Sequence, residues 1–316
     1  MRSLDGMIVG IDVGGTNARA LLVEPGGVEV RARSLASSTG DGPALVATLV
    51  GLVDELRATS QVDAVGLGIA GLAGRDGVLH YSPNLPALVE FPIGPALEQA
   101  SGLPVAVGND ATVATLAEAR LGAGRGSDHL ALVTLGTGIG TGFVLGGRLL
   151  EGANGFAGES GHSVVDADGP THVTGQQGPW EYFASGSALG RLGRDAAAVG
   201  AFGRGVELAG SAESVTGHHV GVALGEGDAQ AAELFDGWCR DVALGVANLV
   251  LLLDLDRIVL GGGLVAVGEP LRDGVARHLV DLLPGASHRP GVEVRLAELG
   301  DDAGALGAAL LAAGRD

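Results

Sequence analysis

Two short stretches of this 316-residue sequence combine closely spaced glycines with side chains that suit phosphate chemistry. Residues 12–16 (DVGGT) end an apolar run, and glycines without Cβ let backbone N–H groups approach a phosphate. Thr16 adds a hydroxyl, and the carboxylate of Asp12 could hold Mg²⁺ through water. The structural alternative is a hairpin turn whose glycines supply positive φ. Residues 135–142 (LGTGIGTG) repeat the pattern with four alternating glycines, and the presence of both motifs favours phosphate binding.

Asn109 and Asp110 follow an apolar, strand-like run and precede a helical stretch. Asp is a preferred residue at the N-cap of a helix, so a purely structural role would account for Asp110. The functional alternative is a general base that accepts the proton of a hydroxyl at the edge of a cleft. Position alone favours the cap, and the two roles do not exclude each other.

Polar side chains recur among glycines in residues 152–182 (GANGFAGESGHSVVDADGPTHVTGQQGPWEY). Glu159, His162 and Glu181 suit carbohydrate recognition, because carboxylates and imidazole exchange hydrogen bonds with several hydroxyls. A metal site is the other possibility, with His162 and His172 as two ligands. The positions that follow His172 do not supply the usual further ligands, so the spacing favours a sugar.

A formal G-x-G-x-x-G motif occupies residues 66–71 (GLGIAG), directly after a strand-like run. A dinucleotide site needs a helix immediately after this motif, whereas residues 72–77 (LAGRDG) are typical of a turn. We therefore expect these glycines to lie close to a ligand or to form a turn. A dehydrogenase is the rival hypothesis, and NAD(P) binding would test it.

The charge balance excludes several classes of site. The formal net charge is −18, from 37 acidic and 19 basic residues, and every basic residue is arginine. The lack of lysine rules out a Walker-type phosphate lysine and a Schiff base, and the acidity disfavours nucleic acid. Cys239 is the only cysteine, so we expect no internal disulfide and a reducing, cytoplasmic setting. We also expect no membrane span, because no apolar run approaches roughly 18 residues.

Hydrophobic periodicity predicts an α/β protein in two similar halves, each opening on a glycine hairpin. The expected domains are residues 1–122, with helix 303–316 as a candidate addition, and residues 123–302. Expected strands are 7–15, 18–24, 28–34, 62–69, 105–107 and 257–260, with a strand–turn–strand unit at 129–147. Expected helices are 43–58, one starting after Asp110, 228–253 and 303–313.

Taken together, these motifs resemble the ROK family of sugar kinases, which have the two-domain, actin-like ATPase (ribonuclease H-like) fold. DVGGT resembles the first phosphate motif, and the Asn109–Asp110 pair matches the one that carries the family's catalytic base. Gly71 and the segment 82–86 (SPNLP) resemble sugar-side segments. GTGIGTG and GANGFAGESGH resemble the family signature. Residues 178–189 (GPWEYFASGSAL) resemble the family's "GCLE-x-x-x-SG" segment, and residues 261–263 resemble its adenosine-side turn.

The resemblance implies ATP-dependent phosphorylation of a hexose at its 6-hydroxyl, most simply of glucose, with the active site in the inter-domain cleft. Asp110 is the implied base, and Asp12 the implied contact to Mg²⁺. The implied sugar-binding residues are Gly71, Asn84, Asn109, Asp110, Glu159, His162 and Glu181. The implied ATP-binding residues are Asp12, Gly14, Gly15, Thr16, Asn17, Gly136, Thr137, Gly138, Gly262 and Gly263.

One departure from the family pattern concerns a metal. Many ROK kinases bind structural zinc through the His of a "GExGH" segment and three cysteines of a "CxCGxxGC" segment. Here His172, Thr174 and Pro179 stand where the cysteines would be. We therefore expect no structural zinc and expect His162 to remain as a sugar contact, with zinc bound by the two histidines and other partners as the alternative. Packing of Trp180, Tyr182 and Phe183 is a candidate replacement for the metal.

Several alternatives stay open. The sugar could be mannose, fructose or an N-acetylhexosamine, and polyphosphate could be the donor. ROK proteins also include sugar-responsive repressors with an N-terminal helix-turn-helix, but here the phosphate strand begins by Met7 and leaves no room for one. A non-catalytic sugar sensor is weaker still, because Asp110 and both hairpins are intact. The resemblance suggests a homo-oligomer, either a dimer or a tetramer.

Overall fold

The computed structural model describes residues 6–24, 29–38 and 41–314 and forms two compact units. The first unit is Met1–Asp128, Gly142–Gly158 and Glu298–Asp316, and the second is His129–Thr141 and Glu159–Ala297. Val28, the expected start of the third strand, and the last two residues of helix 303–316 lie outside the described residues. No helix of the described part is long and apolar enough to cross a bilayer.

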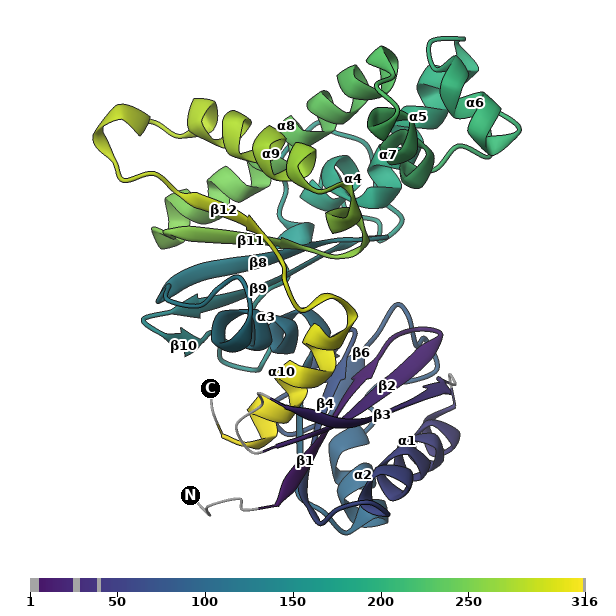
Figure 1. Cartoon of the computed structure of the whole chain (residues 1–316), viewed down its shortest axis with the longest axis vertical. Helices are drawn as coiled ribbons and strands as arrows, with labels where there is room; N and C mark the ends of the chain where they lie inside the picture. Colours follow the sequence, from purple (N-terminus) through teal and green to yellow (C-terminus); the bar gives the residue numbers. More distant parts are fainter. Residues whose placement is uncertain (1–5, 25–28, 39–40, 315–316) are drawn as a thin grey trace. The chain divides into compact units, whose positions relative to one another are not determined.

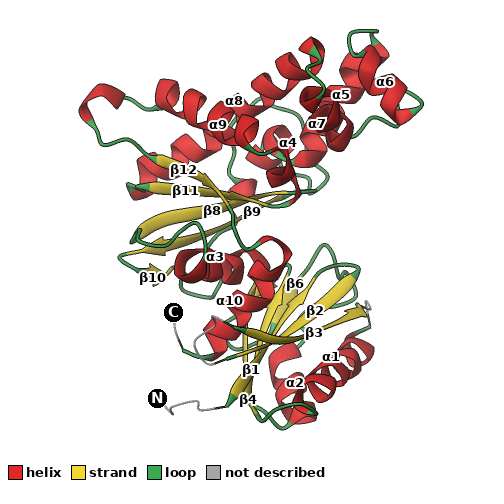
Figure 2. Ribbon diagram, in the orientation of Figure 1, coloured by secondary structure: helices red, strands yellow, loops and turns green. Residues whose placement is uncertain are grey.

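The first unit is a five-stranded sheet between two layers of helices (Figures 1 and 2). Its order is β3-β2-β1-β4-β7, with β1–β2–β3 antiparallel and β4 and β7 parallel to β1. The strands are β1 Met7–Val13, β2 Asn17–Val23, β3 Val30–Ser37, β4 Val62–Ile69 and β7 Val105–Asn109. The helices are α1 Gly42–Arg57 and α2 Ile93–Ser101 on one face, and α3 Asp110–Leu121 and α10 Ala303–Ala312 on the other. A separate ribbon pairs β5 Leu72–Ala73 with β6 Leu79–Tyr81.

Alternation along the strands explains why both faces of this sheet are covered. In β1, Val9 and Ile11 belong to the core under α1, whereas Ile8 packs with α10. The helix α10 approaches the strands closely because they carry glycine where it crosses. A Cβ on Gly10 would lie 1.9 Å from a carbonyl oxygen of α10, and one on Gly66 would lie 1.8 Å from another.

The second sheet has the order β10-β9-β8-β11-β12, and the division between the units falls within β9. Its strands are β8 His129–Leu135, β9 Ile139–Leu145, β10 Arg148–Leu149, β11 Arg257–Gly261 and β12 Glu293–Leu296. The helices of the second unit are α4 Trp180–Ala184, α5 Gly186–Ala198, α6 Gly203–Ala209, α7 Gly217–Gly225, α8 Ala229–Leu253 and α9 Glu269–Leu282. Trp180 and Trp238 are fully buried and anchor this helical layer.

The compact units differ from the expected domain boundary in three places, the first being residues 123–128, which belong to the first unit. Residues 142–158 belong to the first unit, where Arg75 N donates to Asn154 O at 3.3 Å. Residues 298–302 also belong there, because the buried carboxylate of Glu118 accepts from the N–H groups of Glu298 and Leu299 at 3.0 and 2.8 Å. These long-range hydrogen bonds leave no signal in local periodicity.

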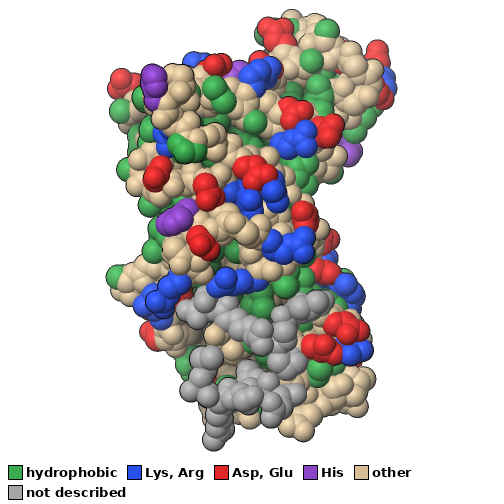
Figure 3. All heavy atoms as spheres, turned by 60° about the vertical axis from the view of Figure 1, so that its left-hand side comes forward, with side chains coloured by type: hydrophobic (Ala, Val, Ile, Leu, Met, Phe, Trp, Pro, Cys, Tyr) green, Lys and Arg blue, Asp and Glu red, His purple; other side chains and the backbone are tan. Residues whose placement is uncertain are grey.

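Charged side chains of both signs are interspersed on the face that Figure 3 presents. Many arginines of the chain are paired with acids, such as Arg204 with Glu226 at 2.7 Å and Arg272 with Asp273 at 2.8 Å. Such pairs lower the local positive charge that a phosphate backbone would need.

Candidate active site

The β1–β2 hairpin of the first unit places an acidic side chain beside an exposed glycine tip. Gly14 N donates to Asn17 O at 2.9 Å and closes the turn, while Gly15, Thr16 and Asn17 are exposed. Ser38 holds the turn from the side: its Oγ donates to Gly14 O and its N to Thr16 O, both at 2.9 Å. The turn is therefore held through its carbonyl groups, and its tip is exposed to a ligand.

Asp12 ends β1 in an environment that opposes its ionisation. Burial and the charge of Asp110 raise its pKa to about 7, whereas the guanidinium of Arg19, its partner in the sheet register, acts in the opposite direction. Arg19 is itself held at 3.0 Å from Asp301. The carboxylate fits beside α10 only because position 304 is glycine, since a Cβ there would lie 2.6 Å from Asp12 Cγ.

The expectation that Asp110 caps its helix is wrong in detail. The N-cap of α3 is Asn109, whose Oδ1 accepts from Thr112 N at 3.1 Å, and Asp110 is the first helical residue. The carboxylate of Asp110 accepts from Ala111 N at 2.9 Å. Burial raises its pKa, and hydrogen bonds to the carboxylate oppose that rise. The capping role thus falls to the neighbouring residue, which leaves Asp110 available as a base.

Parallel pairing brings the acidic residues of the first unit to one edge of the sheet. Val13, Ile69 and Asn109 are aligned across β1, β4 and β7, so Asp12, Gly71 and Asp110 all lie at or just beyond the carboxyl ends of these strands. Carboxyl ends of parallel strands are the usual place for ligands in α/β proteins.

Two further predicted sugar residues join this edge. Asn109 Nδ2 donates to Gly71 O at 3.1 Å, and Gly71 has a φ of 124°, which only glycine adopts easily. Asn84 is exposed and lies beside the hairpin, because a Cβ on Gly15 would be 3.5 Å from that of Asn84. The structure therefore brings Asp12, Gly15, Gly71, Asn84, Asn109 and Asp110 into one region.

The second glycine hairpin joins β8 to β9 and is fixed from two sides. Gly136 N donates to Gly138 O at 3.0 Å, and Gly186 N at the start of α5 donates to Gly136 O at 2.7 Å. On the other side, Ile139 N donates to Glu181 Oε2 at 2.7 Å. A Cβ on Gly138 would lie 2.3 Å from that carboxylate oxygen, so glycine at this position leaves room for the carboxylate.

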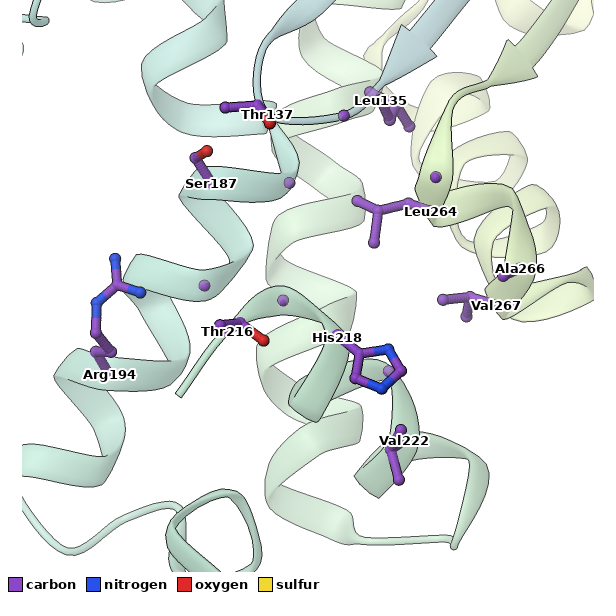
Figure 4. A pocket seen from close by; sticks show the side chains of 16 residues that line it. Leu135, Thr137, Ser187, Arg194, Thr216, His218, Val222, Leu264, Ala266 and Val267 are labelled. Carbon is purple, nitrogen blue, oxygen red and sulfur yellow. The ribbon is translucent and has the colours of Figure 1, made fainter. Parts of the chain in front are cut away.

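A cavity of about 550 Å³ opens beside this hairpin (Figure 4). Its volume falls within the range of small-molecule sites. The predicted residues Gly136, Thr137 and Gly263 line it, and Gly262 supports it with a φ of 82° against the end of β8. Much of the rest of the lining comes from α5, α7 and the N-cap of α7, including Ser187, Arg194, Thr216, His218 and Val222, and the 3-10 helix Gly263–Val267 adds apolar side chains.

The sequence analysis did not predict that α5 and α7 line this cavity. The glycines of the two helices could have indicated it, because they allow close helix packing. A Cβ on Gly190 would lie 3.0 Å from Gly217 N, and one on Gly217 would lie 2.9 Å from Gly186 O. The two helices therefore meet through glycines, two of them four residues apart on α5. Arg194 is the one cation in the lining, and its guanidinium donates to Val215 O at 2.9 Å.

The remaining predicted sugar residues lie in the second unit. Glu159 and His162 flank the short 3-10 helix Ser160–His162, with 3.8 Å between Glu159 Oε2 and His162 Nε2, and both side chains are well exposed. Glu181 lies near the start of α4, and its Oε1 is 3.4 Å from His172 Nε2. Gln176 Nε2 donates to His162 O, which ties residues 166–178 to the 3-10 helix.

The three aromatic residues proposed to hold this segment all make specific contacts. Trp180 is fully buried, and its Nε1 donates to Asp241 O at 2.9 Å. The ring of Tyr182 meets Phe183 edge-on and carries the guanidinium of Arg191 at 3.8 Å from its centroid. No three His, Cys, Asp or Glu side chains within the described ranges cluster as metal ligands.

Comparisons with known proteins identify the family. The ROK family model matches residues 8–315. Glucokinase of Streptomyces coelicolor is 34% identical over 97% of this chain and 98% of its own length, and N-acetylmannosamine kinase of Shigella flexneri is 36% identical over the same shares. The crystal structure of a ROK glucokinase from Streptomyces griseus with glucose and AMPPNP has a TM-score of 0.86 at 34% identity, covering 97% of this chain and 99% of that one.

These matches confirm the α/β, actin-like fold and the sugar-kinase resemblance predicted from the motifs. The chain belongs to the ROK family and is a sugar phosphotransferase.

Proposed function

We propose that this protein transfers the γ-phosphoryl group of ATP to the 6-hydroxyl of glucose. The observation that carries the proposal is the pair of acidic side chains, Asp12 and Asp110, at the carboxyl ends of β1 and β7, the two strands that flank β4, with raised pKa values. A general base works best when its pKa lies near the working pH, and burial moves a carboxyl in that direction.

In the proposed reaction Asp110 accepts the proton of the sugar 6-hydroxyl as the oxygen attacks the γ-phosphorus. A new P–O bond forms while the bond from the γ-phosphorus to the bridging oxygen breaks, and ADP leaves. Glu159, His162, Asn84 and Glu181 would hold the other hydroxyls. Backbone N–H groups of the two hairpins, with the hydroxyls of Thr16 and Thr137, would stabilise charge on the transferring group.

Magnesium fits the first hairpin. The pKa of Asp12 near 7 reflects burial first and the charge of Asp110 second, and a divalent cation would favour the ionised carboxylate. Mg²⁺ is usually held by one or two carboxylates together with substrate phosphates, so a single aspartate suffices. When bound, the ion supplies charge neutralisation for the phosphates, a need made greater by the absence of lysine.

The cavity beside the second hairpin favours a nucleoside triphosphate over polyphosphate as donor. Its lining is mostly apolar, with Leu135, Leu264 and Val267 among its residues, and suits a base and ribose. A polyphosphate chain would need several cations along its length. Arg194 is the one cation in this lining, and it already binds the backbone at Val215.

The comparisons give the sugar two candidates. Named relatives of both specificities, glucokinase and N-acetylmannosamine kinase, match the chain almost equally well. N-acetylmannosamine is therefore the second candidate substrate.

A coupled ADP-release assay with MgATP and a panel of hexoses tests both halves. We expect the highest kcat/KM with glucose, and product analysis should find the phosphate on the 6-oxygen. A higher kcat/KM with N-acetylmannosamine would replace glucose as the substrate. Turnover with polyphosphate but not with ATP would overturn the donor, and no turnover with any sugar would overturn the proposal.

A further inference from the structure

Glu181 joins two parts of the second unit that are far apart in sequence. One carboxylate oxygen accepts from Ile139 N in the glycine hairpin at 2.7 Å, and the other lies 3.4 Å from His172 Nε2. The side chains of Glu181 and His172 are 17% and 15% exposed, so both groups interact largely out of water. A charge contact in such a place is stronger than one at the surface.

The carboxylate of Glu181 occupies the space beside Gly138 of the hairpin. A Cβ on Gly138 would lie 2.3 Å from Glu181 Oε2, so the oxygen takes the room that a side chain at this position would need. Thr137, the residue before, lines the cavity assigned above to the nucleotide. A shift of Glu181 would therefore release the Ile139 N–H and loosen the lining at Thr137.

His172 is held in place by its own surroundings. Its Nδ1 lies 3.1 Å from Thr174 Oγ1, and a hydroxyl can accept from or donate to this nitrogen. Nε2 can therefore carry a proton toward Glu181 in either charge state of the ring. The backbone fixes the residue as well, because His172 N donates to Gln176 O at 2.8 Å and Gly175 N donates to His172 O at 2.9 Å.

From these contacts we propose that His172 is a positioning residue for phosphoryl transfer, acting through Glu181 on the hairpin that holds the nucleotide phosphates. The inference rests on the proposed function for the identity of the ligand, and on the contacts alone for the link between residues. The segment 166–178 is then a brace for the hairpin, and its effect reaches ATP through the hairpin as well as the sugar through the carboxylate of Glu181.

Three variants test the link. His172→Ala removes the contact, and His172→Gln keeps an N–H group of similar reach without the ring. Val173→Ala changes the next residue, whose side chain is 96% exposed, and serves as the matched control. Each protein is measured by hydrogen–deuterium exchange of the peptide that contains Ile139, by calorimetric binding of ADP, and by KM values for ATP and glucose.

We expect His172→Ala to speed exchange at Ile139 and to raise the Kd for ADP and the KM for ATP about fivefold to tenfold, as loss of a polar contact with a carboxylate would. The KM for glucose should rise too, because Glu181 is also a proposed sugar contact. His172→Gln should recover most of the loss, and Val173→Ala should match wild type. Unchanged exchange and ADP affinity in His172→Ala would overturn the proposal. So would a loss confined to glucose, which would make His172 a sugar contact.

Exchange and ADP binding do not depend on sugar phosphorylation. If the wild-type protein phosphorylated no sugar, the proposed function would fail, while these two measurements would still decide whether His172 positions the hairpin.

Discussion

The two glycine hairpins are similar in sequence but lie in different chemical surroundings. The hairpin after β1 carries the acid Asp12 on its own strand, and that carboxyl has a pKa raised to about 7. The hairpin after β8 carries no acid, and a carboxylate from α4, Glu181, binds its backbone N–H group at Ile139. The first hairpin therefore carries an acid whose ionisation its surroundings oppose, whereas the backbone of the second is held by an acid from another element.

This difference suggests a division of labour. Buried acids with a raised pKa, such as Asp12, suit proton transfer and cation binding, because small changes in their surroundings change their ionisation. The β8–β9 turn is held by hydrogen bonds, so it suits a rigid part of a binding-site lining. The cavity of about 550 Å³ lies beside that turn. We infer that similar local sequences acquired different roles through the residues that later parts of the chain bring to them.

The largest expected effect concerns the charge in the first unit. Replacing Asp110 by Asn removes the proton acceptor with little change of shape and should lower kcat about 10²- to 10⁴-fold. Sugar binding should persist, measured by calorimetry with glucose. Asp54→Asn on α1, where the side chain is 59% exposed, is the control and should retain kcat. Near-normal turnover of Asp110→Asn would remove this residue as the base and would weaken the comparison.

A second prediction uses the sign of the pKa shift of Asp12. The folded protein holds this proton up to a pH of about 7, against about 3.8 ordinarily, so the stability from this group is lost as pH rises through 7. Asp12→Asn should therefore be more stable than wild type at pH 8, by at most about 4 kcal/mol, and nearly equal to it at pH 4. Urea unfolding at both pH values measures the difference.

The control for this prediction is a buried acid whose hydrogen bonds are complete. Glu118 accepts from three backbone N–H groups, and Gln would turn an amide donor toward one of them. Glu118→Gln should lose about 1–3 kcal/mol, the opposite sign to Asp12→Asn at pH 8. A gain for Asp12→Asn of equal size at both pH values would contradict the linkage.

A third, smaller effect concerns the space that each carboxylate needs. A Cβ on Gly304 would lie 2.6 Å from Asp12 Cγ, and the short side chain of Asp12 has little freedom to move away. Gly304→Ala should cost about 1–3 kcal/mol of stability and should lower the affinity for MgATP. Gly51→Ala, in α1 with open space around the added methyl, should be neutral or slightly stabilising. Equal melting temperatures of the two variants would count against a crowded Asp12.

Several elements of both units follow from local sequence patterns. The strand at 62–69 is found as predicted, and the helices predicted at 43–58, 228–253 and 303–313 are found to within one residue at each end. These segments have strong periodicity, which local propensity reinforces. The helices of region 186–225 were not predicted, and each contains two or more glycines, which weaken local helix propensity.

The sequence predicts which residues form the candidate site better than it predicts the contacts between them. The motifs identified Asp12, Asn109 and Asp110, and the strand register places them together. Nothing local indicated that Asn109 rather than Asp110 caps α3, since both are good N-cap residues. His172 contacts Glu181, and Glu181 contacts Ile139, which lies 33 residues before His172 in the sequence. Only the folded structure shows such a contact.

The smallest predicted effect sharpens the account of the second hairpin. Gly138→Ala would place a methyl 2.3 Å from Glu181 Oε2, but that atom is the end of a flexible side chain and can move. The cost should therefore be about 1 kcal/mol, the worth of the hydrogen bond to Ile139 N, visible as a small drop in melting temperature. Gly136→Ala is the matched control, because nothing lies within 4 Å of its added methyl. An equal drop in the melting temperature of Gly136→Ala would point to general stiffening of the turn and not to displacement of Glu181. The contact with Glu181 would then no longer distinguish the second hairpin from the first.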